Sequence, residues 1–187
     1  MEIHRIGLFG GTFDPPHVGH VAALEAVAET GRFDVIEVTV AGDPYLKHSD
    51  IDPASVRLAM AHAAFDGLPL VHVSDLEIRR PGPSYTIDTV RELLVNADAL
   101  DLIVGADLAT QLDQWHEAEE LRELVEVAIV PRPGSSSRAP DGWRCYEIDM
   151  QPVDLSSTFI REMDPRAKNL LEFIPASVIP LYEEARG

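Results

Sequence analysis

Two histidines follow a glycine-rich stretch near the start of the chain. In GLFGGTFDPPHVGH, residues 7–20, His17 and His20 stand three positions apart, so both imidazoles share one face if a helix begins there. Gly10 and Gly11 let the backbone approach a ligand and expose amide N–H groups, and two prolines stiffen the loop that follows. A histidine beside phosphate oxygens is driven toward its charged form and donates from both ring nitrogens. The stretch predicts an anion-binding loop, although a bare histidine pair with this spacing is more often an ordinary helix start.

A second polar cluster lies far along the chain, in LSSTFIRE, residues 155–162. Ser156, Ser157 and Thr158 precede an apolar helical stretch, where they would present hydroxyls and unpaired N–H groups at the positive end of a helix. Arg161 comes one turn later and can reach back to the same anion. Taken alone, the cluster also fits a Ser/Thr helix cap with a surface arginine.

The elements that must position these residues alternate along the chain. Short apolar, β-branched runs predict strands at residues 6–9, 34–40, 70–73, 102–104, 125–130 and 144–148. Helical spacing occupies residues 21–28, 53–65 and 86–94, with two short pieces around Leu108 and Leu121. This alternation predicts an α/β fold: a Rossmann-like, doubly wound parallel sheet with helices on both faces, as a single domain of residues 1–187. Ligands of such sheets bind beyond the carboxyl ends of the strands.

Charge and composition narrow the classes of partner. The 187 residues include 32 acidic and 15 Lys or Arg residues, a formal net charge of −17, which argues against nucleic acid and anionic membranes as partners. No apolar run reaches the roughly 20 residues that cross a bilayer, and the first residues lack the features of a secretory signal. The one cysteine, Cys145, fits a reducing compartment, so we expect a cytoplasmic protein. The other histidines show no ligand-like spacing, and we expect no protein metal site.

Five stretches carry a family resemblance that runs from residue 6 to about residue 182. GGTFDPPHVGH and LSSTFIRE resemble the two signatures of the HxGH-type nucleotidyltransferases, which join a small phosphorylated substrate to a nucleoside monophosphate taken from ATP or CTP. GPSYTIDTV, VGADLATQLDQWHEAEEL and IVPRPG are similar to the bacterial nicotinate mononucleotide adenylyltransferase family. The resemblance implies transfer of AMP from ATP to nicotinate mononucleotide, giving nicotinate adenine dinucleotide and pyrophosphate in NAD biosynthesis.

The resemblance also implies roles for individual residues. His17, His20 and Arg161 would be catalytic. Tyr85 and Thr86 would lie near the pyridine mononucleotide, Trp115 would stack on its ring, and Lys47 would contact phosphate. The implied ATP-binding residues are Gly10, Gly11, Thr12, Phe13, His20, Gly105, Asp107, Ser156, Ser157, Thr158 and Arg161. The position of Gly105 and Asp107 agrees with this, because both follow an apolar strand, whereas a lone tryptophan such as Trp115 is more often a partly buried helix-start aromatic.

One loop departs from the family pattern. VTVAGDPYLKHSD has Val40 where the first proline of the loop is expected, although Lys47 is retained. This segment is closer to pantetheine-phosphate adenylyltransferase, so that enzyme or another small-molecule adenylyltransferase of the superfamily is the alternative function. A nucleotide-binding module without turnover is a second alternative. Arg57 fits the helical arginine of either relative or is a solvated helix residue.

The implied chemistry asks little covalent work of the protein. The substrate phosphate attacks the α-phosphorus of ATP in line and expels pyrophosphate, so no covalent enzyme intermediate is required. Positioning and charge neutralisation remain for the protein to supply. We expect ATP and nicotinate mononucleotide as ligands and Mg²⁺ bound with ATP, and the sequence leaves a homo-oligomer open.

Overall fold

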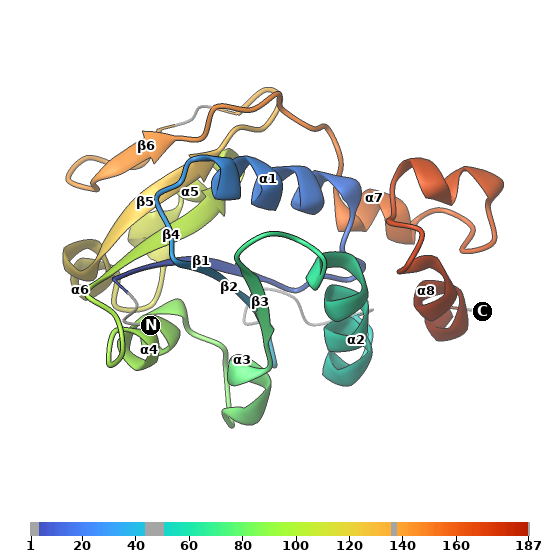
Figure 1. Cartoon of the computed structure of the whole chain (residues 1–187), viewed down its shortest axis with the longest axis horizontal. Coiled ribbons are helices and arrows are strands. Elements are labelled where there is room, and N and C mark those ends of the chain that lie inside the picture. The colour runs from blue at the N-terminus through green and yellow to red at the C-terminus, as the bar shows by residue number, and fades with distance from the viewer. Residues whose placement is uncertain (1–3, 44–50, 136–137, 187) are drawn as a thin grey trace.

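A sheet of six parallel strands forms the centre of the structure, a computed structural model that describes residues 4–43, 51–135 and 138–186. The strand order is β3-β2-β1-β4-β5-β6 (Figure 1). The strands are β1 (Arg5–Gly11), β2 (Val35–Val40), β3 (Val71–Ser74), β4 (Ala99–Gly105), β5 (Val125–Val130) and β6 (Cys145–Glu147). The predicted Rossmann-like parallel sheet is confirmed.

Helices cover both faces of this sheet; in Figure 1, α1 passes above it and α4 lies below it. The α-helices are α1 (Val18–Glu29), α2 (Ala54–Phe65), α3 (Leu76–Arg79), α4 (Thr86–Leu93), α5 (Ala106–Ala109), α6 (Ala118–Leu124), α7 (Ser157–Arg161) and α8 (Ile179–Arg186). Two 3₁₀ helices, η1 (Leu112–Gln114) and η2 (Lys168–Glu172), complete the described elements.

The sequence of β1 is apolar at successive positions because both faces of the strand are covered. Leu8 packs into the cluster under α4 and α6 with Leu102, whereas the neighbouring Phe9 packs into the cluster under α1 and α2 with Val38. A parallel sheet covered on both faces buries most side chains of its central strands, and the result is a continuous apolar run rather than an alternating one. The same pattern explains why the predicted strands match the observed ones within a few residues.

The structure corrects the expected end of β1. The sequence predicts a strand that ends at residue 9, but β1 continues through Gly10 and Gly11 and pairs them with Thr39 and Val40 of β2. Their backbone therefore belongs to the ladder, and the loop begins at Thr12. This placement brings the loop directly over the carboxyl edge of the sheet.

The strand order reverses at β1, which lies between β2 and β4. From β1 the sheet grows through β2 and β3 on one side and through β4, β5 and β6 on the other. The loops that follow β1 and β4 therefore diverge from each other at the carboxyl edge. In open α/β sheets this switch point is where ligands bind. The first histidine motif follows β1, and Gly105 ends β4.

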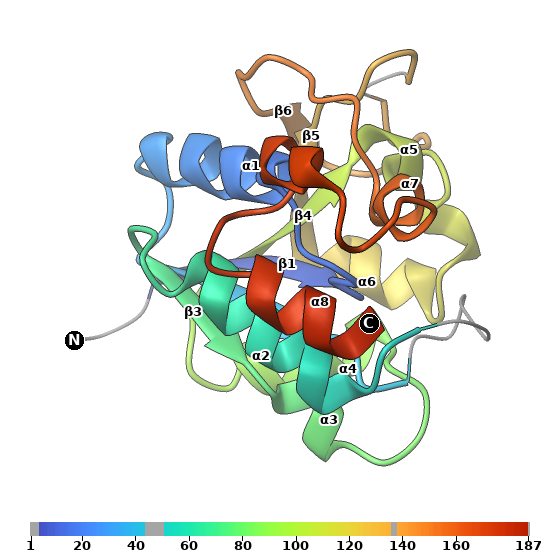
Figure 2. The same ribbon diagram turned by 90° about the vertical axis from the view of Figure 1, so that its right-hand side faces the viewer.

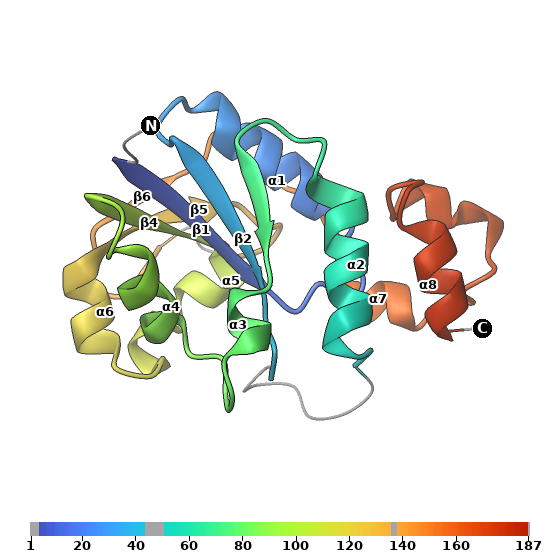
Figure 3. The same cartoon turned by 60° about the horizontal axis from the view of Figure 1, so that its bottom comes forward.

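The C-terminal segment forms an apolar cluster of its own against α2. Met60 of α2 packs there with Ile160 of α7 and Tyr182 of α8. Figures 2 and 3 both show α8 beside α2. Helix α8 was not predicted, since it is only eight residues long and carries Pro180 near its start. Among the described residues, no helix combines the length and apolarity that a membrane span needs.

Candidate active site

The loop after β1 is shaped by the packing of one phenylalanine. Phe13 has a left-handed backbone (φ 51°), and its buried ring folds back so that a Cβ on Gly11 would lie 2.7 Å from it. Only glycine fits at position 11 for this reason. Because the Phe13 ring packs against Phe9 and Phe65, Phe13 can offer a nucleotide its backbone but not its side chain.

The two histidines stack on each other at the start of α1. Their ring centroids are 3.6 Å apart and their planes are inclined by 19°. His17 is the residue before the first turn of the helix, and its backbone N–H donates to Nδ1 of His20 at 3.2 Å. The predicted shared face is confirmed.

The surroundings of the two rings differ. His17 is 1% exposed, and its burial, reinforced by the positive charge of Arg132, lowers its pKa to about 3. His17 is therefore neutral at pH 7, the opposite of the charged form that a neighbouring phosphate would favour. His20 is half-buried and reaches the pocket described next.

A pocket opens between α1 and the carboxyl ends of β4 and β5. Its lining residues are Phe9, Gly19, His20, Ala23, Gly105, Val130, Pro131, Arg132, Met150 and Val153. A Cβ on Gly105 would lie 2.5 Å from Oδ1 of Asp107 and 3.4 Å from Nε of Arg132. Glycine at this position thus lets a carboxylate and a guanidinium approach the strand end, the edge at which open α/β sheets bind their ligands.

The second motif packs directly on the first. Ser157 Oγ donates to the carbonyl of Pro15 at 2.9 Å, and Arg161 Nη1 donates to the carbonyl of Asp14 at 2.7 Å. Arg161 Nη2 lies 3.3 Å from Thr158 Oγ1, to which it donates. The fold thereby joins two segments that are more than a hundred residues apart in the sequence.

Of the helix cap and the surface arginine that the second motif allows, the structure shows only the cap. Ser156 does cap α7, because its Oγ accepts from the backbone N–H of Phe159 at 3.2 Å. Arg161, however, is not a surface arginine, since its side chain is only 15% exposed. The motif is a helix cap that also holds a largely buried cation against the first loop.

The predicted acceptor residues gather on the other face of the sheet. Tyr85 precedes α4, which Thr86 begins, and the Tyr85 ring stacks on that of His116 with centroids 4.0 Å apart. Trp115 is half-buried and packs against the same apolar cluster as Tyr85. Lys47 lies outside the described residues. Two of the family-like stretches are therefore in contact, while the histidines lie on the face covered by α1.

Two buried or half-buried residues at the site, Arg132 and Asp14, were missing from the sequence-derived set, and the role of a third, Arg57, was left open. Arg132 lines the pocket and donates from Nη1 to the carbonyl of Leu155 at 2.7 Å, and its buried Nε has no partner among the described residues. The sequence contained a signal for Arg132, because this residue follows the predicted strand at residues 125–130 and so falls at the carboxyl edge of the sheet. Asp14 is completely buried between the motifs. Arg57 is 2% exposed and donates to the Thr12 carbonyl at 2.9 Å, which excludes the solvated-helix interpretation.

The comparisons with known proteins agree with this geometry. Residues 8–163 match the model of the cytidylyltransferase-like family. A protein of Exiguobacterium sibiricum described as a probable nicotinate-nucleotide adenylyltransferase is 37% identical over 182 residues, 96% of each chain. One of Geobacillus kaustophilus with the same description is 36% identical over 98% of this chain and 85% of its own. The chain belongs to the nicotinate-nucleotide adenylyltransferase family.

Solved structures share the fold of this family member. The Plasmodium falciparum nicotinic acid mononucleotide adenylyltransferase complexed with NaAD superposes with a TM-score of 0.77, at 20% identity over 97% of this chain and 95% of that one. The same enzyme complexed with APC gives a TM-score of 0.74 at 19% identity. The strand order and switch point described above are thus those of an adenylyltransferase fold.

Proposed function

We propose that the enzyme transfers AMP from ATP to nicotinate mononucleotide, and that the pocket beside His20 receives the ATP. The observation that carries the proposal is the contact between the two motifs, which places His20, Arg132 and Arg161 around one edge of the sheet. In a protein with a net charge of −17, such a concentration of donors is suited to an anion. The descriptions of the relatives support nicotinate mononucleotide as the acceptor.

The reaction balances without a covalent enzyme intermediate. A phosphate oxygen of nicotinate mononucleotide forms a bond to the α-phosphorus of ATP while the bond from that phosphorus to the bridging oxygen of pyrophosphate breaks. The products are nicotinate adenine dinucleotide and pyrophosphate. Holding both substrates in line can lower such a barrier by on the order of 7–11 kcal/mol, so positioning is the main task of the protein.

His20 is the group best prepared to donate to a phosphate. Because its Nδ1 accepts the backbone N–H of His17, the proton of the neutral ring is on Nε2. His17 holds the His20 ring in this orientation through the ring stack and the backbone hydrogen bond. Arg161 adds a permanent positive charge that would attract the triphosphate. This attraction would strengthen as negative charge moves to the leaving pyrophosphate.

The acceptor would bind on the α4 face. Tyr85, Thr86 and Trp115 belong to stretches that the fold brings together there, and the Tyr85–His116 stack marks the contact between them. Gly105 lies at the end of β4, from which α5 leads toward the acceptor residues. The two substrates would therefore meet over the carboxyl edge of β1 and β4.

Magnesium fits this scheme as part of the ATP substrate. The polar side chains of the pocket lining belong to His20 and Arg132, and Arg161 joins the loop beside it; their nitrogen donors suit phosphate oxygens rather than Mg²⁺. Among the described residues, no group of three His, Cys, Asp or Glu side chains could hold a metal ion. Mg²⁺ would then be held by the triphosphate and would neutralise part of its charge.

Pyrophosphate release tests the proposal directly. The purified protein is incubated with ATP and Mg²⁺ and with nicotinate mononucleotide, nicotinamide mononucleotide or 4'-phosphopantetheine in parallel. We expect release with nicotinate mononucleotide and formation of the dinucleotide. Release with 4'-phosphopantetheine alone would support the alternative suggested by the segment around Val40, and no release with any acceptor would support a binding module without turnover.

A further inference from the structure

A buried charge cluster connects the first motif to the C-terminal helix. Asp14 is 0% exposed, and its Oδ2 accepts from the backbone N–H of Asp52 at 3.3 Å and from Arg186 Nη2 at 3.2 Å. Arg186, in the last turn of α8, also donates from Nε to the Asp52 carboxylate at 3.1 Å. The end of the chain thus holds the loop that leads to the histidines.

Arg161 faces the same carboxylate oxygen from the other side. Its Nη1 lies 3.9 Å from Asp14 Oδ2, too far for a hydrogen bond, while it donates to the carbonyl oxygen of that residue. Charges attract more strongly in a protein interior than in water, so a buried aspartate without a partner would draw the Arg161 guanidinium toward itself. Among the described residues, Arg161 and Arg186 are the cations within 4.0 Å of the Asp14 carboxylate.

We propose that Arg186 is a positioning residue of the reaction: by pairing with Asp14, it keeps the Arg161 guanidinium directed to the triphosphate of ATP. The inference rests on the proposed function, since Arg161 must have a phosphate to bind. It assigns a role to a residue that lies outside both motifs. In an acidic protein, a carboxylate next to the phosphate site is a competitor for the cation, and α8 supplies the charge that removes this competition.

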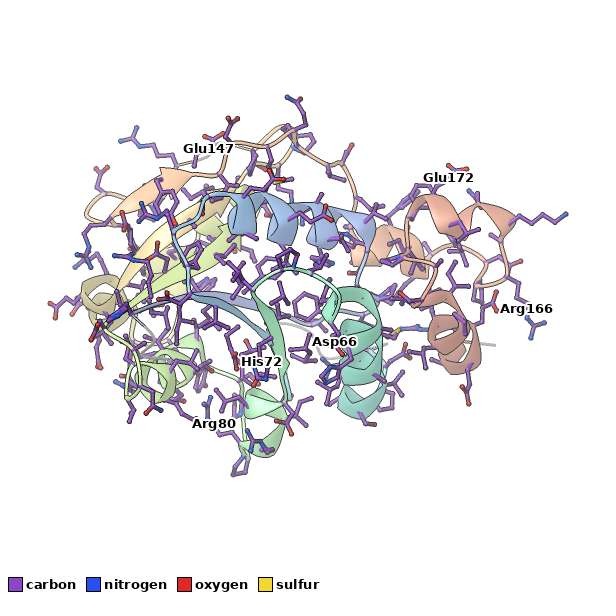
Figure 4. All side chains as sticks on the ribbon, in the orientation of Figure 1. Asp66, His72, Arg80, Glu147, Arg166 and Glu172 are labelled. Carbon is purple, nitrogen blue, oxygen red and sulfur yellow. The ribbon has the colours of Figure 1, made fainter. Side chains whose placement is uncertain are left out.

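The first experiment removes the charge of Arg186. Arg186→Gln should raise the dissociation constant of a non-hydrolysable ATP analogue about tenfold, the equivalent of about 1.4 kcal/mol of binding free energy. Arg186→Lys should recover part of the affinity, because the ammonium keeps the charge and loses one of the two contacts. The matched control is Arg166→Gln, which removes the same charge from an exposed side chain that points into solvent (Figure 4) and should leave ATP affinity unchanged.

The second experiment tests whether Arg186 acts through Asp14. In an Asp14→Asn background the carboxylate that lies 3.9 Å from Arg161 Nη1 is gone, so adding Arg186→Gln should no longer weaken ATP binding. If Arg186→Gln alone does not fold, Arg186→Lys takes its place in the comparison: its partial loss of ATP affinity in the wild-type background should disappear in the Asp14→Asn background. An equal loss of ATP affinity in both backgrounds would overturn the inference, as would unchanged affinity in a folded Arg186→Gln protein. Failure of the wild type to release pyrophosphate would instead count against the proposed function.

Discussion

The imidazole ring of His17 lies 3.6 Å from that of His20, yet the two rings meet different surroundings. His17 is buried and neutral at pH 7, while His20 lines the pocket. The sequence treats the pair as equivalent, since both belong to one motif and one helix face. We therefore propose a division of labour in which His17 supports the loop and His20 contacts the substrate.

Replacing His20 should therefore remove turnover and keep the fold. We expect His20→Ala to lower kcat by on the order of 10²–10³-fold, as is typical for loss of a donor to transition-state charge. The urea midpoint should change little, because the ring is half-buried. The control is His62→Ala, which removes an exposed histidine of α2 that pairs with Asp66, the residue after the helix. Normal turnover of His20→Ala, or an unfolded variant, would contradict the assigned role.

His17 should make the protein less stable in mild acid. The unfolded chain takes up a proton on this histidine below about pH 6.5, whereas the folded protein does so only near pH 3. Stability is therefore lost as the pH falls through this interval, by about 1.4 kcal/mol per pH unit. Between about pH 7.5 and 5.5, urea unfolding should show wild type losing about 1.4 kcal/mol more than His17→Gln. Parallel profiles for the two proteins would show that His17 is not held neutral.

The contribution of Arg161 to ATP binding and turnover should depend on the shape of its guanidinium as well as on its charge. Arg161→Lys keeps the charge but cannot contact the Asp14 carbonyl, Thr158 and a phosphate with one planar fork. We expect it to retain some activity and Arg161→Ala to lose on the order of 10²–10³-fold in kcat/KM. ATP affinity should weaken in the same order. Measuring the free energy of unfolding for each variant separates substrate binding from the contact between the motifs. Equal ATP affinity and turnover in wild type and Arg161→Ala would reduce the second motif to a helix cap.

A methyl group on Gly105 should disturb the nucleotide pocket with little effect on folding. The added Cβ would lie 2.5 Å from Asp107 Oδ1, and an exposed aspartate at the start of α5 can rotate away. The backbone of Gly105 (φ −67°) suits any residue. Gly105→Ala should raise the KM for ATP and leave that for nicotinate mononucleotide nearly unchanged, as steady-state kinetics would show. A selective effect on the acceptor would place the two substrates differently.

Trp143 should affect the binding of the acceptor substrate through its hydrogen bond to Asp113. Its Nε1 donates to the Asp113 carboxylate at 2.8 Å, in the 3₁₀ turn directly before Trp115. Trp143→Phe keeps an aromatic ring in this buried position and removes the donor, so the turn that carries Trp115 loses an anchor. We expect a severalfold higher KM for nicotinate mononucleotide and an unchanged KM for ATP. An unchanged acceptor KM would mean that the turn is held by packing alone.

The sequence by itself determined the order and type of most elements. The strand predicted at residues 125–130 is the observed Val125–Val130, and the helix predicted at 53–65 differs from Ala54–Phe65 by one residue. Both follow from local periodicity, because a strand buried on both faces reads as a short apolar run and a helix as a repeat near 3.6 residues. The two motifs were recognisable for the same reason, since each is a continuous segment.

Only the tertiary structure decided how these residues are used. The pKa of His17 is lowered by the packing that buries its ring and by the charge of Arg132, more than a hundred residues away in the sequence. The hydrogen bond from Ser157 to Pro15 spans 142 positions, and Arg186 reaches Asp14 across 172. Local sequence patterns report which side chains a segment carries, but burial, charge pairing and pKa depend on neighbours that other elements supply. For this reason the sequence named the histidines and Arg161, and the fold brought Arg132 and Arg186 to the first motif and buried Asp14 within it.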